Sequence, residues 1–232
     1  TPAGTLVVAE AEILLQQSRT FSHNLQLYRH GATGKLKIGM GPLVASLAMP
    51  KLSITLLHSK PQLQFQAVVK SANLLLTELR NDELELLYAA KEYFIGVSDL
   101  DVRPLSTLAI ARIVRAEHPL ATHKTVTQSD LANYPVLCAT ELSSRNPTSG
   151  AFICDNYHIL SQTVTESDSV WIGSPRLVQK EIDTGRLLVL NVDDEDLVKS
   201  TSICEVRRKG ITPSPAAELV SQFMRNYFCD TE

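Results

Sequence analysis

The alternation of strand-like and helix-like segments in the first third of the chain constrains the fold most. Residues Lys35–Gly39 alternate polar and apolar side chains, which predicts a short strand. The Gly41-Pro42 turn then leads into an apolar helix predicted at Leu43–Leu57. Further segments are predicted as strand, helix and strand, at Leu63–Val69, Asn73–Asn81 and Glu83–Leu87. This β-α-β-α-β order is typical of a parallel sheet covered by helices, so we expect an α/β fold.

The rest of the chain repeats these signals, and its 232 residues allow one large domain or two lobes. Leu105–Val114 is predicted to be a strand that crosses between lobes, and Thr127 or Ser129 is predicted to cap a short helix. Further strands are predicted at Tyr134–Ala139, Val170–Gly173, Leu187–Val192 and Ile203–Arg207, and helices at Pro175–Asp183 and Pro213–Phe228.

The N-terminal segment is predicted to be a long amphipathic helix. Apolar side chains recur every three or four residues, with gaps, from Leu6 to Tyr28, and the pattern ends at Gly31 and Gly34. A long helix with one modest apolar stripe favours packing on a partner helix, so we interpret it as a linker or dimerisation helix. The alternative is an ordinary surface helix.

Composition excludes several classes of protein. The chain is 44% hydrophobic and 20% charged, which is typical of a soluble globular protein. Its formal net charge of −3 lacks the basic surplus of a self-sufficient nucleic-acid binder. No apolar run approaches the roughly 20 residues that span a bilayer, so no contact with a membrane is expected. The four cysteines are scattered without CxxC pairs, which favours reduced, mostly buried thiols over a redox switch.

The sequence contains no recognisable catalytic or metal-binding motif. GxSxG, HExxH, GxxxxGKS/T and GxGxxG are all absent, and the six histidines do not cluster at ligand spacing, so each is interpreted as a surface or turn residue. We therefore expect no enzyme, metal or cofactor. Trp171 is interpreted as a core residue, and the triplet Arg207-Arg208-Lys209 as a solvated corner instead of a nucleic-acid patch.

A binding site is predicted instead at turns assigned to the carboxyl ends of strands. In open α/β sheets, ligands bind beyond those ends, where backbone N–H groups and hydroxyls are available. If two α/β lobes face each other, four such turns can surround a small ligand, and donors without a nucleophile bind without reacting. The predicted residues are Gly41, Pro42, Leu43, Lys70, Ser71, Ala72, Ala139, Thr140, Glu141, Ser167 and Asp168.

Several stretches, taken together in their order and spacing, resemble one family over essentially the whole chain. The start TPAG precedes a long helix, GATGKLKIG resembles a first strand, and LRNDELELLYA resembles a G-E-L-D-L core segment. RAEHPLA at Arg115–Ala121 and DLANYPVL at Asp130–Leu137 resemble an entry into a second lobe. With IGSPRLVQKEIDTGRLLVL and VRRKGITPSPAAELVSQFMRNY, the sequence resembles the effector-binding region of LysR-type transcriptional regulators.

The resemblance implies a fold similar to type 2 periplasmic binding proteins, with two Rossmann-like lobes joined by crossing strands and a small-molecule effector between them. It implies a linker helix at residues 1–33, lobe one at 34–111 and 203–232, and lobe two at 112–202. It also implies a cytoplasmic homodimer or homotetramer that contacts DNA only through a winged helix-turn-helix, which precedes the linker helix in this family. A solute-binding protein of a transporter shares the fold and is the alternative.

Two departures from the family pattern concern the predicted site. Ser167 and Asp168 stand where the family often has glycines, and Asp168 could either bind a ligand or cap a neighbouring element. Pro42 and Leu43 stand where a hydroxyl residue is common, so one hydrogen bond to an anionic effector is missing. Charge pairing with an acidic effector is assigned to Lys70 or Arg145, and hydroxyl donation to Ser71 and Thr140.

Overall fold

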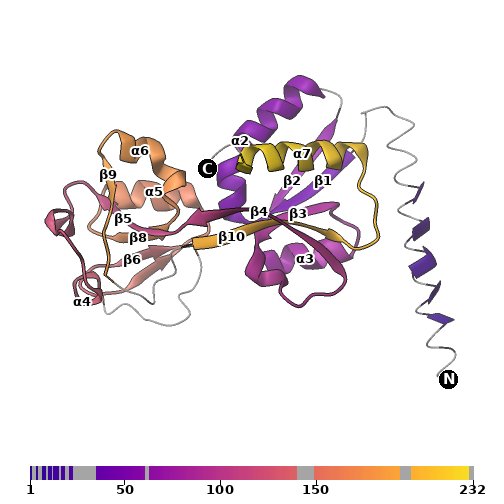
Figure 1. Cartoon of the computed structure of the whole chain (residues 1–232), viewed down its shortest axis with the longest axis horizontal. Coiled ribbons are helices and arrows are strands. Elements are labelled where there is room, and N and C mark those ends of the chain that lie inside the picture. The colour runs from indigo at the N-terminus through magenta and orange to yellow at the C-terminus, as the bar shows by residue number, and fades with distance from the viewer. Residues whose placement is uncertain are drawn as a thin grey trace.

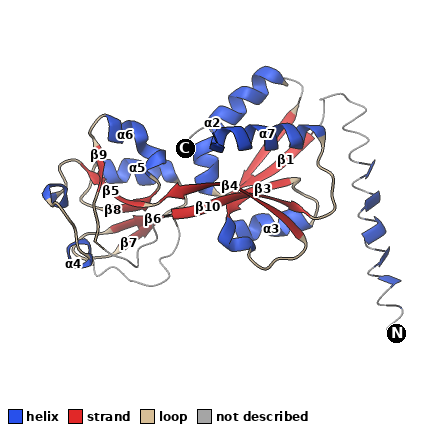
Figure 2. Ribbon diagram, viewed as in Figure 1, coloured by secondary structure: helices blue, strands red, loops and turns tan. Residues whose placement is uncertain are grey.

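The computed structural model describes residues 35–60, 63–139, 149–193 and 200–229, together with residues 1, 4, 7, 8, 10, 11, 13–15, 17, 18, 21 and 22 near the N-terminus. The described residues from 35 onward form two α/β lobes that lie side by side, each built on its own sheet (Figure 1). Figure 2 shows the two sheets between their helices.

The first lobe is built on a five-stranded mixed sheet of order β2-β1-β3-β10-β4. Its strands are β1 (Lys35–Met40), β2 (Gln64–Val69), β3 (Leu86–Ala90), β4 (Leu100–Ala109) and β10 (Ser200–Arg208). β1 is parallel to β2 and β3, whereas β10 is antiparallel to β3 and β4. The helices of this lobe are α2 (Pro42–Ser59), α3 (Ala72–Arg80), the 3-10 turn η1 (Lys91–Phe94) and α7 (Pro215–Cys229).

The alternation of side chains along β1 explains how helices cover both faces of this sheet. Leu36, Ile38 and Met40 are fully buried in a core shared with α2 and α7. The opposite face packs on α3, which belongs to a separate core cluster. A Cβ added at Gly39 would lie 2.8 Å from side-chain atoms of Leu75 in α3, so glycine at this position allows the close approach of helix and sheet.

The second lobe is built on a five-stranded sheet of order β7-β6-β8-β5-β9. Its strands are β5 (Ala111–Arg115), β6 (Val136–Cys138), β7 (Ala151–Ile153), β8 (Val170–Gly173) and β9 (Leu187–Val189). Its helical elements are η2 (Pro119–Thr122), α4 (Gln128–Leu131), α5 (Tyr157–Thr165), η3 (Pro175–Val178) and α6 (Gln179–Asp183). β6, β7 and β8 are mutually parallel, whereas β5 is antiparallel to β8 and β9.

The passage between lobes differs from the predicted single strand at Leu105–Val114. That segment contains the end of β4 and most of β5, which belong to different sheets, so the chain changes lobe at Ile110. The return passage precedes β10, which runs antiparallel to β4. The other expected strands and helices are present within a few residues, whereas α5 and β7 were not predicted.

Two local predictions are decided by hydrogen bonds and burial. Thr127 is the N-cap of α4, because its hydroxyl accepts from the backbone N–H of Asp130 while the Asp130 carboxylate accepts from the backbone N–H of Thr127. Trp171 is fully buried, as predicted for a core residue.

The prediction of a solvated corner at Arg207-Arg208-Lys209 is wrong for the two arginines. β10 extends through Arg208, so Arg207 is buried, only 6% exposed, beside Glu205. Arg208 forms an ion pair with Asp82. Both guanidinium groups are therefore paired with carboxylates inside the lobe, because a buried cation without a partner is costly.

Candidate functional site

In the first lobe, the structure brings together the two predicted turns Gly41–Leu43 and Lys70–Ala72. They follow β1 and β2, which are parallel, so both turns lie at the same edge of the sheet. The backbone N–H of Lys70 donates to the carbonyl of Met40 at 3.3 Å, and that of Gly41 donates to the carbonyl of Tyr88 in β3 at 2.8 Å. The carboxyl ends of β1, β2 and β3 thus form one continuous rim.

The chemistry of this rim is mainly that of helix N-termini and a hydroxyl. α2 begins at Pro42, which has no backbone N–H, and its N-cap Gly41 has no side chain to cap it. α3 begins after Ser71, an exposed residue whose hydroxyl makes no capping hydrogen bond. At this edge the hydroxyl of Ser71 makes no capping hydrogen bond, and the first N–H groups of α3 have no partner within the helix.

Lys70, to which charge pairing with an acidic effector was assigned, already has a carboxylate partner. Its ammonium forms an ion pair with Glu78, two turns into α3, and Lys37 approaches the same carboxylate at 3.4 Å. The hydrogen bond from Lys70, supported by Lys37, holds the pKa of Glu78 below its usual value. An acidic ligand at the rim would have to compete with Glu78 for Lys70.

In the second lobe, the predicted turn after β6 lies at the carboxyl edge of three parallel strands. Ala139 follows β6, Cys154 follows β7 and Ser174 follows β8. The backbone N–H of Cys154 donates to the carbonyl of Cys138 at 3.0 Å, which holds the ends of β6 and β7 together. The remaining predicted residues of this loop, Thr140, Glu141 and Arg145, lie outside the described residues.

Ser167 and Asp168 are not brought to this edge. They precede β8, and since β8 is parallel to β6, its amino end lies at the edge opposite to Ala139. The Asp168 carboxylate accepts from Nε of Arg115 at 2.9 Å, and Nη2 of Arg115 lies 2.8 Å away. The Ser167 hydroxyl donates to the carbonyl of Thr163. In this structure both side chains serve contacts within the second lobe.

His118 lies beside this amino-end cluster at a turn, as expected of a histidine that is not on the surface, and it is buried. It is 1% exposed, and its Nδ1 accepts from the backbone N–H of Leu120 at 3.0 Å. Burial lowers the pKa of His118, while the nearby Asp168 carbonyl and carboxylate oppose that shift. The lowered pKa favours the neutral imidazole in this buried position.

The two carboxyl edges face one another across the junction between the lobes. α2 starts at the carboxyl end of β1 and contacts both α5 and η3, which follow the carboxyl ends of β7 and β8. Leu177 of η3 packs against the main core cluster of each lobe. The guanidinium of Arg176 donates to the carbonyl of Tyr227 in α7 at 3.4 Å.

Several polar residues near this junction were missed by sequence reasoning. Ser174 is buried and directly follows β8. Because the strand Val170–Gly173 was predicted, Ser174 could have been recognised from the sequence as a residue at its carboxyl end. The hydroxyls of Thr107 and Ser202 lie 3.2 Å apart on the crossing strands β4 and β10. In the sequence, Thr107 and Ser202 look like ordinary polar residues of a strand, so nothing indicated that they lie at the junction.

Among the described residues, the cysteines are not cross-linked and the side chains able to bind a metal do not cluster. None of the four cysteines forms a disulfide: Cys138 and Cys204 are buried, Cys154 is half-buried and Cys229 is exposed. Burial raises the pKa of the Cys204 thiol to about 12. Among the residues that the structure describes, His, Cys, Asp and Glu form no group of three or more that could hold a metal ion. Within the same residues, no helix is long and apolar enough to span a membrane.

Two α/β sheets joined by antiparallel crossing strands, with the carboxyl ends of parallel strands facing across the junction, define a fold of the periplasmic-binding-protein-like class. The sequence matches the LysR substrate binding domain over residues 29–229, so the chain belongs to that family. It is the effector-binding domain of a LysR-type transcription regulator.

Similar proteins of known role are transcription regulators. The chain is 29% identical over 230 residues to the SDS degradation transcriptional activation protein of Pseudomonas sp. (strain ATCC 19151). That alignment covers 94% of this chain and 75% of the other protein. It is 28% identical over 206 residues to the HTH-type transcriptional regulator PcaQ of Agrobacterium fabrum (strain C58 / ATCC 33970), in an alignment that covers 82% of this chain and 65% of the other protein. These relatives favour a regulator over a transporter component.

Solved structures support the same fold at low sequence identity. An OxyR regulatory domain from Pseudomonas aeruginosa has a TM-score of 0.64 at 16% identity and covers 86% of this chain and 99% of its own. The CcmR regulatory domain of Synechocystis PCC6803 in complex with 2-PG has a TM-score of 0.65 at 14% identity, covering 85% and 98%. At these identities the likeness concerns the fold alone.

Proposed function

We propose that a small-molecule effector binds between the two lobes and shifts their arrangement. The observation that carries this proposal is the contact of α2 with α5 and η3, since all three elements begin at the carboxyl ends of parallel strands. A ligand held at both rims touches both lobes, so it favours the arrangement to which it binds better. Binding without chemical reaction is the proposed role, in the cytoplasm.

The proposed lobe boundaries lie within three residues of the points where the crossing strands pass from one sheet to the other. The first lobe comprises residues 34–111 and 203–232, the second residues 112–202, and residues 1–33 form a linker to an N-terminal winged helix-turn-helix. The passage at Ile110 supports this division.

The proposed effector contacts come from Ser71, the turn Gly41–Leu43 and the loop after Ala139, including Thr140. Lys70 is held by Glu78 and Pro42 donates no hydrogen bond, so a ligand with neutral hydrogen-bonding groups fits the first rim better than a simple carboxylate. The name of the SDS degradation activator adds alkyl sulfates to the compounds worth testing.

The effector proposal is tested by thermal shift of the chain against a panel of octyl sulfate, small hydroxy compounds and organic acids, followed by calorimetry of any compound that binds. Ser71→Ala and Thr140→Ala are each expected to weaken binding about fivefold or more, because each removes one hydrogen bond to the ligand. Thr122→Ala is the matched control, because its exposed hydroxyl donates to the carbonyl of Pro119, away from both rims. Unchanged affinity in both test variants would refute the assignment.

We also propose that the N-terminal helix joins two copies of the chain, as a homodimer or as part of a homotetramer. The described residues between Gly4 and Ser22 are helical, and Val7, Leu14 and Phe21 are each 65% exposed. A spacing of seven residues places these three side chains on one stripe, which a second copy of the helix can cover. Packing of two such stripes would hold two copies of the chain together, and with them the two DNA-binding domains.

Sedimentation of the intact chain and of a chain lacking residues 1–33 tests this assembly. We expect the intact chain to be a dimer or larger and the shortened chain to form a smaller assembly. Leu14→Glu is expected to weaken association, whereas Ser22→Glu adds the same charge at an exposed helical position turned away from the stripe and serves as the control. A monomeric intact chain would contradict the proposal.

A further inference from the structure

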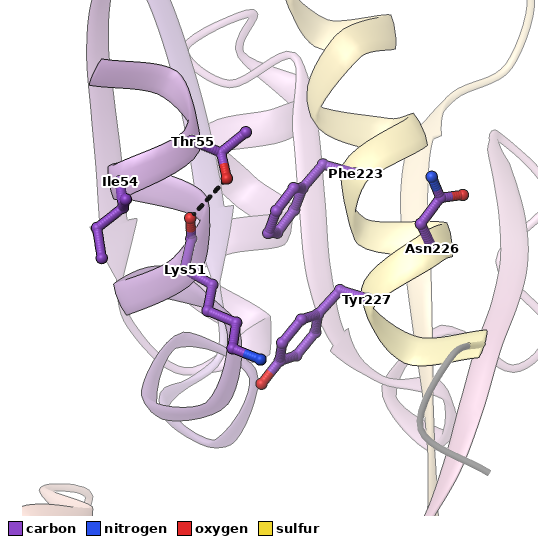
Figure 3. A pocket seen from close by; sticks show the side chains of 6 residues that line it. All are labelled: Lys51, Ile54, Thr55, Phe223, Asn226 and Tyr227. Carbon is purple, nitrogen blue, oxygen red and sulfur yellow. Dashed lines mark hydrogen bonds between the residues drawn. The ribbon is translucent and has the colours of Figure 1, made fainter. Parts of the chain in front are cut away.

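A groove between α2 and α7 lies outside the rims described above. Its volume is about 360 Å³, and Figure 3 shows the side chains that line it: Lys51, Ile54, Thr55, Phe223, Asn226 and Tyr227. Lys51 is ten residues beyond Gly41, about 15 Å along the axis of α2 at 1.5 Å per residue. The groove is therefore a separate site on the first lobe, and its volume suits a small organic molecule.

One wall of the groove is aromatic and rigidly held. The rings of Phe223 and Tyr227 are one turn apart on α7, with centroids 6.0 Å apart and planes only 9° from parallel. The Tyr227 hydroxyl donates to the carbonyl of Leu47 in α2 at 2.7 Å, which fixes that ring across the two helices. Ile54, 57% exposed, adds an apolar surface from α2. Flat apolar rings of a ligand can stack on such a wall.

The charge of the groove is positive. Nζ of Lys51 lies 5.5 Å from the centroid of the Tyr227 ring, and within the described residues no carboxylate lies within 4.0 Å of it. The guanidinium carbon of Arg176, from the second lobe, lies 5.2 Å from the same centroid. None of the six lining residues is acidic. An anionic group placed beside Lys51 would gain a charge-assisted hydrogen bond.

We propose that this groove is a second binding site, for a small planar aromatic carboxylate. The rings of the ligand stack on Phe223 and Tyr227, and its carboxylate pairs with the ammonium of Lys51. The groove lies on the first lobe, and Tyr227, which lines it, also contacts Arg176 of η3 in the second lobe. The site is independent of the proposed effector site at the strand ends.

Calorimetric titration of the intact chain with 2-naphthoate tests the site. We expect saturable binding of one molecule per chain, and at least fivefold weaker binding of the neutral analogue 2-naphthamide. Lys51→Gln, at an exposed position that tolerates the change, is expected to weaken 2-naphthoate about fivefold and to leave 2-naphthamide unaffected. Lys180→Gln, which removes an exposed helical lysine from α6, is the matched control and should change neither affinity.

A second variant separates the aromatic wall from the charge. Phe223→Leu keeps an apolar side chain of similar reach, so the fold is retained, and circular dichroism verifies this; both ligands are expected to bind several-fold more weakly. The proposal is overturned if 2-naphthoate fails to saturate in the millimolar range, or if Lys51→Gln binds it with unchanged affinity. It is also overturned if sedimentation shows that the titration signal reports association of two copies, because the groove would then be a subunit interface.

Discussion

Removal of the Glu205 carboxylate is expected to destabilise the first lobe more than any change on its surface. Glu205 is 1% exposed and accepts hydrogen bonds from the hydroxyls of Tyr88, at 3.0 Å, and Ser221. Nη2 of Arg207 lies 3.4 Å from its other oxygen, too poorly aligned for a hydrogen bond, so that contact is mainly Coulombic. One buried carboxylate thus connects β3, β10 and α7.

The magnitude follows from what Glu205→Ala leaves behind. Two hydroxyls lose their acceptor, and each unsatisfied donor costs about 1–3 kcal/mol when buried. Arg207 keeps Asp101 at 3.4 Å and Glu218 at 4.0 Å, so its charge is only partly uncompensated. Breaking a buried pair from one side costs about 3–5 kcal/mol, and we expect Glu205→Ala to fall in that range.

Urea unfolding followed by circular dichroism measures this cost. Glu205→Gln retains one acceptor oxygen and is expected to cost about 2 kcal/mol. Glu83→Gln, at a side chain that is 51% exposed and outside this cluster, is the control and should cost under about 1 kcal/mol. The double variant Glu205→Leu with Arg207→Met should cost less than the sum of its single changes, because no unpaired charge remains. Additive costs, or a Glu205→Ala variant within about 1 kcal/mol of the parent, would refute this account of the cluster.

The remaining predictions concern a close contact, a buried imidazole and the thiols. Gly173→Ala would place a Cβ 2.7 Å from the buried ring of Trp171, so we expect a loss of about 1–3 kcal/mol and a changed tryptophan emission spectrum. The pKa of His118 is lowered in the folded state, so its stabilising contribution is present above the ordinary value of 6.5 and is lost as the pH falls below it. Between pH 7.5 and pH 5 the melting temperature should therefore decrease, and His118→Gln should make that decrease smaller. In the native protein at pH 8, Ellman's reagent should modify exposed Cys229 quickly, whereas Cys204, whose pKa is raised to about 12 by burial, should react only on unfolding.

The proposed binding site shows how far sequence reasoning reaches. The turns after β1 and β2 were predicted together, and they lie together, because parallel neighbouring strands end at one edge. The turn containing Ser167 and Asp168 was grouped with them although it precedes its strand, and the direction of β8 places it at the opposite edge. The effector role of all these residues stays a proposal.

The limits of the helix and strand predictions have a similar physical origin. Leu105–Val114 is apolar throughout, and nothing in its pattern marks Ile110 as the point where hydrogen bonding passes from one sheet to another. From the sequence, Arg207 was predicted to be solvated. Its burial is made possible by two carboxylates: Asp101, which is distant in the chain, and Glu205, which precedes it by two residues on β10.

By itself, the sequence determined the local elements and the α/β class, because the period of apolar side chains is set by the geometry of each strand or helix. β8, predicted and found at Val170–Gly173, illustrates this. The tertiary structure alone decided which strand ends face each other, which charges are buried and that α2 and α7 form a groove. Those features depend on contacts between residues far apart in the chain, such as Leu47 and Tyr227, which local periodicity does not encode.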